Sequence, residues 1–314
     1  MMIQKIVIAG AGTMGSSMAQ IYAEYFDDVV LYNHRQETLE LAKERIESNV
    51  ATLVETGNLT KEKAGSLLGA LSYTTSMECF KTCDFVAENL SENLEIKDDF
   101  YKKLSEVISN TAVITTNTSG MSINLLSRSV KWPERFIGMH WFNPPHLVPL
   151  IEIIKGEKTR EDVAQTVYDL SLKIGKKPVL VNRDIPGFAA NRLQFAILRE
   201  ALALVAQGVV SAEGIDDVMK YGLGFRYAYA CLGPLEVADF GGLDTFTHIS
   251  GYLMKDLCDS KEVPELMQAH FDAGEYGVKS EKGFYDYSDG RAKEATKERD
   301  EKFLKVYQAL YGSK

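Results

Sequence analysis

Short apolar runs alternate with amphipathic helical stretches through the first half of the chain. The apolar runs read, in order, KIVIAG, DVVLYN, CDFVAENL, TAVITTN and ERFIGMHWF, and helical patterns begin near Ser16, Gln36 and Glu95. Strands separated by helices of this length are typical of crossover units, in which strands pair in parallel and helices cover both faces of the sheet. The pattern therefore predicts an α/β domain with a parallel sheet.

A long charged helical stretch, residues 37–68, interrupts this alternation. It is broken at Gly57 and Asn58, which suit a helix C-cap and the turn that follows it. We therefore expect a helical hairpin inserted into the sheet domain. Lys61 and Lys63 on one face of this hairpin are expected either to be solvated or to meet an anionic ligand.

Strand-like runs nearly disappear in the second half of the chain, where helical periodicity dominates. The segment DIPG, residues 184–187, marks the change, because proline and glycine interrupt regular elements. The sequence thus predicts an α/β domain over residues 1–184 and an all-α domain over residues 185–314. We expect the apolar helices of the second domain to supply a subunit interface.

The composition narrows the class of partner. The 314 residues carry a formal net charge of -9 with a pI near 5.2. Nucleic-acid binders need a basic surface, so we expect no nucleic-acid partner. No apolar run approaches the length that spans a bilayer, so we expect no membrane partner. The N-terminus passes from MMIQK directly into IVIAG, without the succession of a secretory signal, and we expect a cytoplasmic protein.

Potential metal ligands are few and scattered. The chain has four cysteines and five histidines, and only Cys79 and Cys83 lie close together. Neither a disulfide framework nor a zinc pattern follows from this spacing. The sequence therefore predicts reduced thiols and no metal site.

The stretch GAGTMG follows the first apolar run and opens the first helix. We expect its residues Gly10, Gly12, Thr13, Met14 and Gly15 to contact a cofactor, because bare amides at a helix N-terminus hold a pyrophosphate. A strand before, a helix after and a second strand nearby favour this interpretation over a merely tight turn. The sequence therefore predicts that the α/β domain is a Rossmann-type NAD(P)-binding domain.

Cofactor preference depends on the end of the second apolar run, which reads YNHR. Asn33 stands there, where an acidic residue would usually bind the ribose hydroxyls of NAD. A carboxylate would repel the 2'-phosphate of NADP, whereas Asn33 tolerates it and Arg35 could pair with it. Arg35 is equally compatible with a solvated surface position. We expect NAD as the cofactor, and Asn33 is also compatible with NADP.

A histidine and a glutamate lie within the hydrophobic passage GMHWFNPPHLVPLIEI. In a strand, Leu150, Glu152 and Ile154 would share one face and their neighbours the other, and both faces look buried. A buried carboxylate needs a hydrogen-bonding or cationic partner, and His140 on a neighbouring strand is the candidate. The alternatives are a satisfied core histidine and a carboxylate at a surface edge strand.

Several segments together resemble the 3-hydroxyacyl-CoA dehydrogenase family, in particular short bacterial 3-hydroxybutyryl-CoA dehydrogenases. In order, these segments are GAGTMG, ENLSENLEIK, TTNTSG, RFIGMHWFNP, LIEIIKG, DIPGFAANR and GPLEVADFGGLD. The resemblance covers nearly the whole chain. It implies that His140 is the catalytic base, that Glu152 orients it, and that Ser119 and Asn191 hold the reacting oxygen.

The resemblance also implies cofactor contacts. Asn143 would lie beside the nicotinamide and the substrate, and Glu92 and Lys97 would line the nicotinamide-ribose end of the site. Three features depart from the family pattern: Asn33 replaces an aspartate, Gly120 replaces a common serine, and a Pro-Pro-His sequence follows Asn143. The last feature occurs in relatives that act on carnitine or sugar acids.

The expected function is hydride transfer between a nicotinamide cofactor and an L-3-hydroxyacyl-CoA of short chain, such as 3-hydroxybutyryl-CoA, in fatty acid metabolism. One alternative is a dehydrogenase of a free hydroxy acid such as L-gulonate, or of carnitine. Another is a catalytically inactive, crystallin-like cofactor-binding protein. The resemblance further implies that the C-terminal domain, residues 185–314, serves substrate binding and forms a homodimer.

Overall fold

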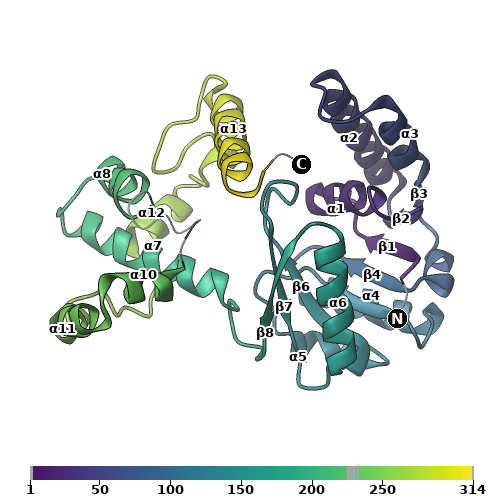
Figure 1. The fold of residues 1–314 in the computed structure, drawn as a ribbon, viewed down its shortest axis with the longest axis horizontal. Coiled ribbons are helices and arrows are strands. Elements are labelled where there is room, and N and C mark those ends of the chain that lie inside the picture. Colours follow the sequence, from purple (N-terminus) through teal and green to yellow (C-terminus); the bar gives the residue numbers. More distant parts are fainter. Residues whose placement is uncertain (1–2, 225–230, 232, 313–314) are drawn as a thin grey trace. The chain divides into compact units, whose positions relative to one another are not determined.

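The chain forms two compact units, Met1–Arg192 and Leu193–Lys314, in a computed structural model that describes residues 3–224, 231 and 233–312 (Figure 1). The first unit contains a β-sheet and the second is helical. The predicted fold class, a Rossmann-type α/β domain with an inserted helical hairpin followed by an all-α domain, is confirmed. The domain boundary after residue 184 stays a prediction.

One eight-stranded sheet organises the first unit. Its strands are β1 (Lys5–Ala9), β2 (Asp28–Tyr32), β3 (Leu71–Thr74), β4 (Phe85–Glu88), β5 (Val113–Thr116), β6 (Phe136–Trp141), β7 (Leu150–Ile154) and β8 (Lys177–Val181). They lie in the order β3-β2-β1-β4-β5-β6-β7-β8 (Figure 1). The two edge strands, β3 and β8, are at most half-buried. They therefore lack the continuous apolar run by which the sequence reveals the inner strands.

One strand pair departs from the predicted parallel sheet. β6 and β7 pair antiparallel, whereas the other strand pairs are parallel. A parallel pair needs a crossover of about a dozen residues or more, and the segment between these strands, residues 142–149, is too short for one. The predicted parallel pairing therefore does not extend to this pair.

Helices cover both faces of the sheet, as the alternation predicts. They are α1 (Thr13–Ala23), α2 (Gln36–Glu55), α3 (Lys61–Gly69), α4 (Leu94–Val107), α5 (Ile123–Leu126) and α6 (Glu161–Lys173). α1, α2, α3 and α6 share one core cluster, and α4 and α5 contribute to the other. α2 and α3 form the predicted hairpin, in which Thr60 caps α3 by accepting a hydrogen bond from the Lys63 amide at 3.2 Å.

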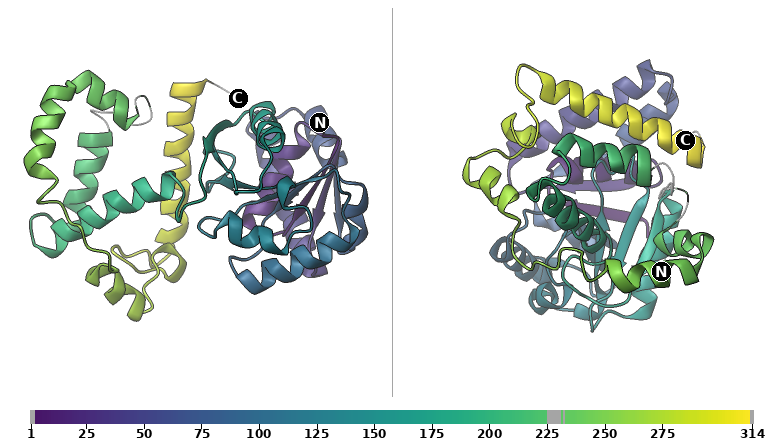
Figure 2. Two further views of the ribbon diagram at one scale, coloured as in Figure 1. Left: turned by 90° about the horizontal axis from the view of Figure 1, so that it is seen from below. Right: turned by 90° about the vertical axis from the view of Figure 1, so that its left-hand side faces the viewer.

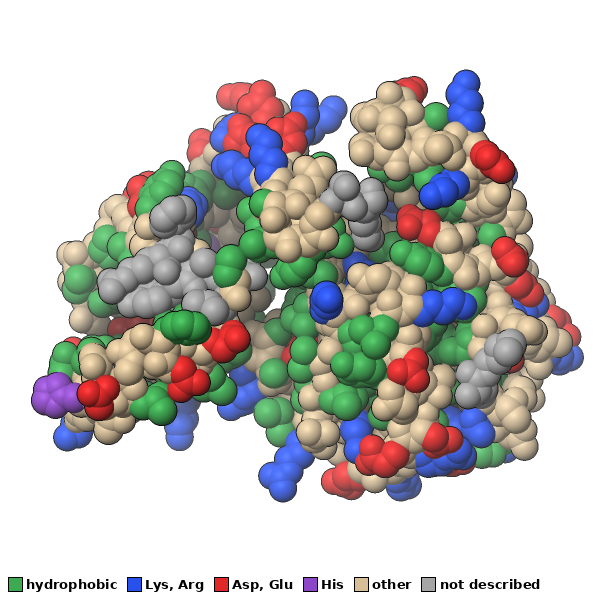
Figure 3. All heavy atoms as spheres, viewed as in Figure 1, with side chains coloured by type: hydrophobic (Ala, Val, Ile, Leu, Met, Phe, Trp, Pro, Cys, Tyr) green, Lys and Arg blue, Asp and Glu red, His purple; other side chains and the backbone are tan. Residues whose placement is uncertain are grey.

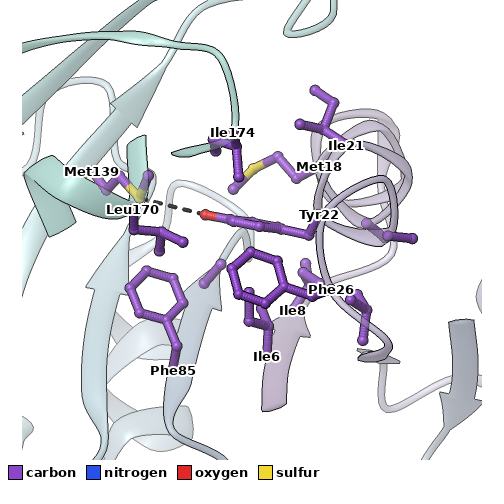
Figure 4. Close-up of a cluster of buried hydrophobic side chains, with 14 of the residues drawn as sticks. Ile6, Ile8, Met18, Ile21, Tyr22, Phe26, Phe85, Met139, Leu170 and Ile174 are labelled. Carbon is purple, nitrogen blue, oxygen red and sulfur yellow. Dashed lines mark hydrogen bonds between the residues drawn. The ribbon is translucent and has the colours of Figure 1, made fainter. Parts of the chain in front are cut away.

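Tyr22 of α1 lies in the middle of the first core cluster, among isoleucines of β1 and side chains of α6 (Figure 4). Its hydroxyl donates a hydrogen bond to Sδ of Met139 on β6 at 3.6 Å. Burial raises the pKa of this phenol far above its ordinary value. The contact joins the first crossover helix to the strand that carries His140.

The second unit is built from helices, which Figure 2 shows from two further directions. They are α7 (Ala190–Ala206, whose first turn belongs to the first unit), α8 (Ala212–Asp217), α10 (Pro234–Gly241), α11 (Leu243–Leu253), α12 (Glu265–Asp272) and α13 (Arg291–Tyr311). Among its described residues, only Leu202 and Val237 are buried hydrophobic side chains. A domain of this size normally buries far more apolar surface.

Acidic and basic side chains are interspersed on the face drawn in Figure 3.

Short 3₁₀ turns occur at Met77–Thr82, Ser127–Ser129, Pro133–Arg135 and Val278–Ser280, and a π-helical turn occurs at Val218–Leu223. Within the described parts of the chain, no helix has the length and apolar character needed to cross a bilayer.

Candidate active site

The glycine loop between β1 and α1 has the geometry of a dinucleotide-binding turn. Gly10 has a φ of 107°, and a Cβ there would lie 2.5 Å from the Asn89 carbonyl oxygen. A Cβ on Gly15 would lie 1.8 Å from the Gly10 carbonyl oxygen. Both glycines are therefore required by the packing of loop, helix and sheet. Gly12 is different, because a Cβ there would meet no atom within 4 Å.

The N-terminus of α1 suits an anion. Gly12 is the N-cap residue, no side chain caps the helix, and its first turn contains no acidic residue. The leading amides, including those of Thr13 and Met14, can therefore bind an anionic group, which the positive end of the helix dipole attracts. The open space above Gly12 lets such a group approach the backbone closely. These features fit the pyrophosphate of a dinucleotide.

Asn33 lies at the end of β2, beside this loop. Its side-chain oxygen accepts a hydrogen bond from the Ala11 amide at 3.4 Å, and its side-chain nitrogen donates to the Arg35 carbonyl oxygen at 3.2 Å. Asn33 is buried, whereas Arg35 is exposed at the start of α2. The Asn33 side chain thus ties the glycine loop to the turn that carries Arg35.

His140 and Glu152 face each other across the antiparallel pair of β6 and β7. Nδ1 of the imidazole lies 2.9 Å from Oε2 of the carboxylate, and both side chains are buried. Oε1 of Glu152 accepts hydrogen bonds from the amides of Ala189 at 3.0 Å and Ala190 at 2.9 Å. The alternative of Glu152 as a surface carboxylate is wrong, because its side chain is 1% exposed.

Opposing effects set the acidity of Glu152. Burial favours the neutral acid, but hydrogen bonds from His140, Ala190 and Ala189 and the charge of a protonated imidazole favour the carboxylate. Their combined effect lowers the pKa of Glu152 below its ordinary value of 4.5. The residue is therefore ionised at neutral pH and fixes the orientation of the imidazole through Nδ1.

Two aromatic rings enclose the imidazole of His140. The Phe142 ring centroid lies 4.4 Å away and that of Phe188 lies 5.7 Å away. Gly187 and Phe188 both have positive φ angles, of 75° and 49°, and the second value is unusual for a residue with a side chain. This turn directs the next two amides onto Glu152. The sequence interpretation missed Phe188, although its place after Pro-Gly was the available signal.

Ser119 and Asn191 come together in the structure. The Asn191 side-chain nitrogen donates to the Ser119 carbonyl oxygen at 2.8 Å. The Ser119 amide donates to Oε1 of Glu92 at 2.9 Å, and the Thr118 hydroxyl donates to the same oxygen. Asn191 follows Ala189 and Ala190 directly in sequence, so one short segment contacts both Glu152 and the Ser119 loop.

Lys97 is enclosed beneath this loop. Its ammonium group lies 2.6 Å from Oε1 of Glu88 and 3.7 Å from Oε2 of Glu92, and its side chain is 1% exposed. Glu88 also accepts hydrogen bonds from the Tyr101 and Thr116 hydroxyls, each at 2.6 Å. Lys97 therefore reaches the loop through Glu92, which is 45% exposed. The sequence interpretation missed Glu88, an acid at the end of a fully buried strand.

The remaining predicted residue, Asn143, is exposed in the segment that follows β6. Gly10, Asn33 and Glu92 likewise follow β1, β2 and β4. All four thus lie beyond the carboxyl ends of parallel strands, where open α/β sheets bind their ligands. The cofactor and catalytic roles of the individual residues stay predictions.

Comparison with known proteins adds to this geometry. The 3-hydroxyacyl-CoA dehydrogenase NAD-binding domain profile matches residues 5–185, and the profile of that family's C-terminal domain matches residues 187–287. The 5-formyl-3-hydroxy-2-methylpyridine 4-carboxylate 5-dehydrogenase of Mesorhizobium japonicum is 36% identical over 312 residues, which cover 99% of each chain. The probable 3-hydroxybutyryl-CoA dehydrogenase of Deinococcus radiodurans is 38% identical over 284 residues, which cover 90% of this chain and 100% of the relative.

A solved structure is similar over its full length. It is that of a 5-formyl-3-hydroxy-2-methylpyridine 4-carboxylic acid 5-dehydrogenase, described as an NAD+-dependent dismutase, with a TM-score of 0.90, 35% identity and 100% of both chains covered. The Rossmann unit and these similarities define an oxidoreductase with NAD as its cofactor, as the sequence predicts. The chain belongs to the 3-hydroxyacyl-CoA dehydrogenase family.

Proposed function

We propose that this protein interconverts a short-chain L-3-hydroxyacyl-CoA and the corresponding 3-oxoacyl-CoA, with His140 as general acid and base. The observation that carries the proposal is the buried pair of His140 and Glu152 near the carboxyl end of the sheet. The relatives named 3-hydroxybutyryl-CoA dehydrogenase support the choice of substrate.

The arrangement suits the oxidation of a secondary alcohol. NAD, when bound, supplies the acceptor for the hydride that leaves carbon. Glu152 engages Nδ1 of His140, which leaves Nε2 to take the hydroxyl proton. The ionised carboxylate then stabilises the imidazolium that forms, and in the reductive direction the imidazolium returns the proton to the carbonyl oxygen. Phe142 and Phe188 limit the access of water to the ring.

Ser119 and Asn191 are proposed to hold the reacting oxygen. The hydrogen bond from the Asn191 side chain to the Ser119 carbonyl oxygen, together with the one from the Ser119 amide to Glu92, supports this role. A loop fixed from two sides presents polar groups without a large reorganisation when substrate binds, which favours the transition state. Lys97 is proposed to act on the nicotinamide-ribose end through Glu92.

A second substrate class has a specific observation in its favour. The pyridine-carboxylate dehydrogenase aligns with this chain over its full length, including α13, which lies beyond the matched C-terminal profile. The probable 3-hydroxybutyryl-CoA dehydrogenase of Deinococcus radiodurans aligns over 90% of this chain. The second candidate function is therefore NAD-dependent dehydrogenation of a free carboxylate that carries an alcohol or aldehyde group.

Steady-state assays distinguish the two candidates. NADH oxidation would be followed with acetoacetyl-CoA, and NAD reduction with 5-formyl-3-hydroxy-2-methylpyridine 4-carboxylate, L-gulonate and L-carnitine. The first proposal expects the thioester to give the highest kcat/KM. If the thioester is not turned over and a free carboxylate is, the second candidate replaces the first.

A variant of the base tests the shared chemistry. His140→Gln is expected to lower kcat about 100- to 10,000-fold while NADH binding, followed by fluorescence, is retained. His270→Gln is the matched control, because His270 also pairs with a glutamate, Glu275 at 2.7 Å, within the second unit. Unchanged turnover in His140→Gln would contradict the mechanism. Cofactor binding without turnover of any substrate by the wild type would favour the inactive, crystallin-like alternative.

We also propose that the protein is a homodimer through its second unit. Leu235 and Phe240 of α10 are each 81% exposed, and Leu243 and Tyr252 of α11 are each 60% exposed. Apolar side chains exposed to this extent over neighbouring helices are typical of a subunit interface. Cytoplasmic location and a role in fatty acid metabolism stay predictions.

A further inference from the structure

A buried lysine outside the predicted site supports the segment that follows the catalytic strand. Lys176 stands between α6 and β8, and it is 3% exposed. Its ammonium group donates hydrogen bonds to the carbonyl oxygen of Pro145 and, at 2.9 Å, to that of Val148. It also lies 5.4 Å from the centroid of the Trp141 ring. One cation thus contacts the end of β6 and two points of the segment 142–149.

The segment 142–149 contains two adjacent prolines. Pro144 and Pro145 have no amide N–H, and the Pro144 carbonyl oxygen accepts hydrogen bonds from the amides of Leu147 at 3.1 Å and Val148 at 3.0 Å. The carbonyl oxygens of Pro145 and Val148 receive their hydrogen bonds from Lys176. An ammonium group carries three donors, so one lysine can serve several carbonyl groups at once. The charge is in turn stabilised by the two carbonyl dipoles and the face of the indole ring.

The position of the segment bears on His140. Trp141 follows His140 directly, and the Phe142 ring packs against the imidazole. Asn143, the predicted contact of nicotinamide and substrate, comes next. A displacement of the Pro145–Val148 turn would therefore shift Asn143 relative to His140, whose own position is fixed by the sheet and Glu152.

We infer that Lys176 is a positioning residue, which holds the segment 142–149 so that Asn143 and His140 face the same substrate. This inference rests on the proposed function for the identity of the substrate. It assigns Lys176 no contact with substrate or cofactor. Loss of the ammonium group should weaken substrate binding while leaving the base and the glycine loop unchanged.

Three variants test this role. In Lys176→Met the stem is retained and the donors are lost, whereas Lys176→Gln keeps an amide donor at a shorter reach. Lys177→Met is the matched control, because Lys177 is the exposed neighbour at the start of β8. We expect KM for the substrate to rise about tenfold in Lys176→Met and by less in Lys176→Gln, with NADH affinity unchanged within about twofold. The control should keep wild-type values.

A second measurement needs no substrate. Amide hydrogen exchange at Leu147 and Val148 should be at least about tenfold faster in Lys176→Met than in the wild type or Lys177→Met. If Lys176→Met does not fold, as judged by thermal melting, Lys176→Gln carries both measurements. Unchanged amide exchange in the Lys176 variant would contradict the claim that Lys176 holds the segment 142–149. Faster exchange with an unchanged KM would contradict its proposed effect on substrate binding. Failure of the proposed function would appear separately, as undiminished turnover in His140→Gln.

Discussion

At the scale of single residues, the geometry around Glu152 makes a definite kinetic prediction. Three N–H groups, from His140, Ala189 and Ala190, converge on its two oxygens. In Glu152→Gln only one oxygen remains, so at least one donor meets the amide nitrogen instead of an acceptor. We expect kcat to fall about 10- to 100-fold, with KM for NADH little changed, because the imidazole loses its orientation and its counter-charge. A change confined to KM would contradict the orienting role.

The same variant tests the charge of Glu152 in the folded protein. A carboxylate whose pKa is lowered by folding stabilises the native state above its ordinary pKa of 4.5, and this contribution is lost as the pH falls through the folded pKa. The free energy of unfolding of the wild type should therefore exceed that of Glu152→Gln by about 2 kcal/mol near neutral pH. The difference should shrink below pH 4.5. Denaturant titrations of both proteins at several pH values measure it, and a difference that grows in acid would be the wrong sign.

Asn33 gives a prediction about the cofactor. Its side-chain oxygen holds the Ala11 amide, a bond that an aspartate can also accept. Asn33→Asp keeps this contact, loses the hydrogen bond to the Arg35 carbonyl oxygen, and adds a negative charge where we propose that the 2'-phosphate of NADP would lie. The ratio of kcat/KM for NADH over NADPH should rise at least about tenfold. Arg35→Ala is the companion variant, and a rise of the ratio in it as well would identify Arg35 as the partner of the phosphate.

The predictability of the site differed between residues for a physical reason. The period of a strand places Glu152 in the interior, and the cost of an unpaired buried charge then calls for a partner such as His140. Glu88 ends a buried strand and Phe188 follows a Pro-Gly pair, but these positions do not reveal the partners of either residue, and Lys176 gives no local signal. Their roles depend on carbonyl, hydroxyl and ring partners that are distant in sequence, and only the folded chain brings these together.

At the scale of elements, the turn from β1 to α1 contains glycines with two different roles, one in packing and one proposed in cofactor binding. Gly15→Ala would force a methyl group against the Gly10 carbonyl oxygen, so α1 could not pack on the sheet. We expect this variant to lose cooperative folding. Gly12→Ala meets no protein atom, and we expect its melting temperature to change little while its affinity for NADH falls about tenfold or more. Thermal melts with and without NADH measure both effects. Retained NADH affinity in Gly12→Ala would contradict the placement of the pyrophosphate at this turn.

The elements themselves were largely predictable, and the exceptions follow from burial and connection length. Inner strands such as β1 and β4 are apolar apart from one charged residue at an end, because both of their faces are covered. β3 and β8 lie at the edges and lack that pattern. The pattern of apolar positions alone does not show that β7 runs antiparallel to β6. That direction follows from the length of the segment 142–149, which is too short for a crossover.

At the scale of the whole molecule, the sparse core of the second unit predicts assembly. With only Leu202 and Val237 as buried hydrophobic side chains among its described residues, this unit gains little stability from its own packing. A second copy of the chain would cover the exposed apolar side chains of α10 and α11. We therefore expect a dimeric molar mass by light scattering at micromolar concentration.

A charge in that surface should separate the copies. Phe240→Glu places a carboxylate where the proposed interface would bury it unpaired, at a cost of several kcal/mol. We expect a monomeric molar mass and a lower melting temperature, since dimerisation stabilises the folded subunit by mass action. Leu41→Glu is the matched control, because Leu41 is 60% exposed on α2 of the first unit and should leave the dimer intact. A monomeric wild type would contradict the proposed dimer. A dimer that persists in Phe240→Glu but dissociates in Leu41→Glu would place the interface elsewhere.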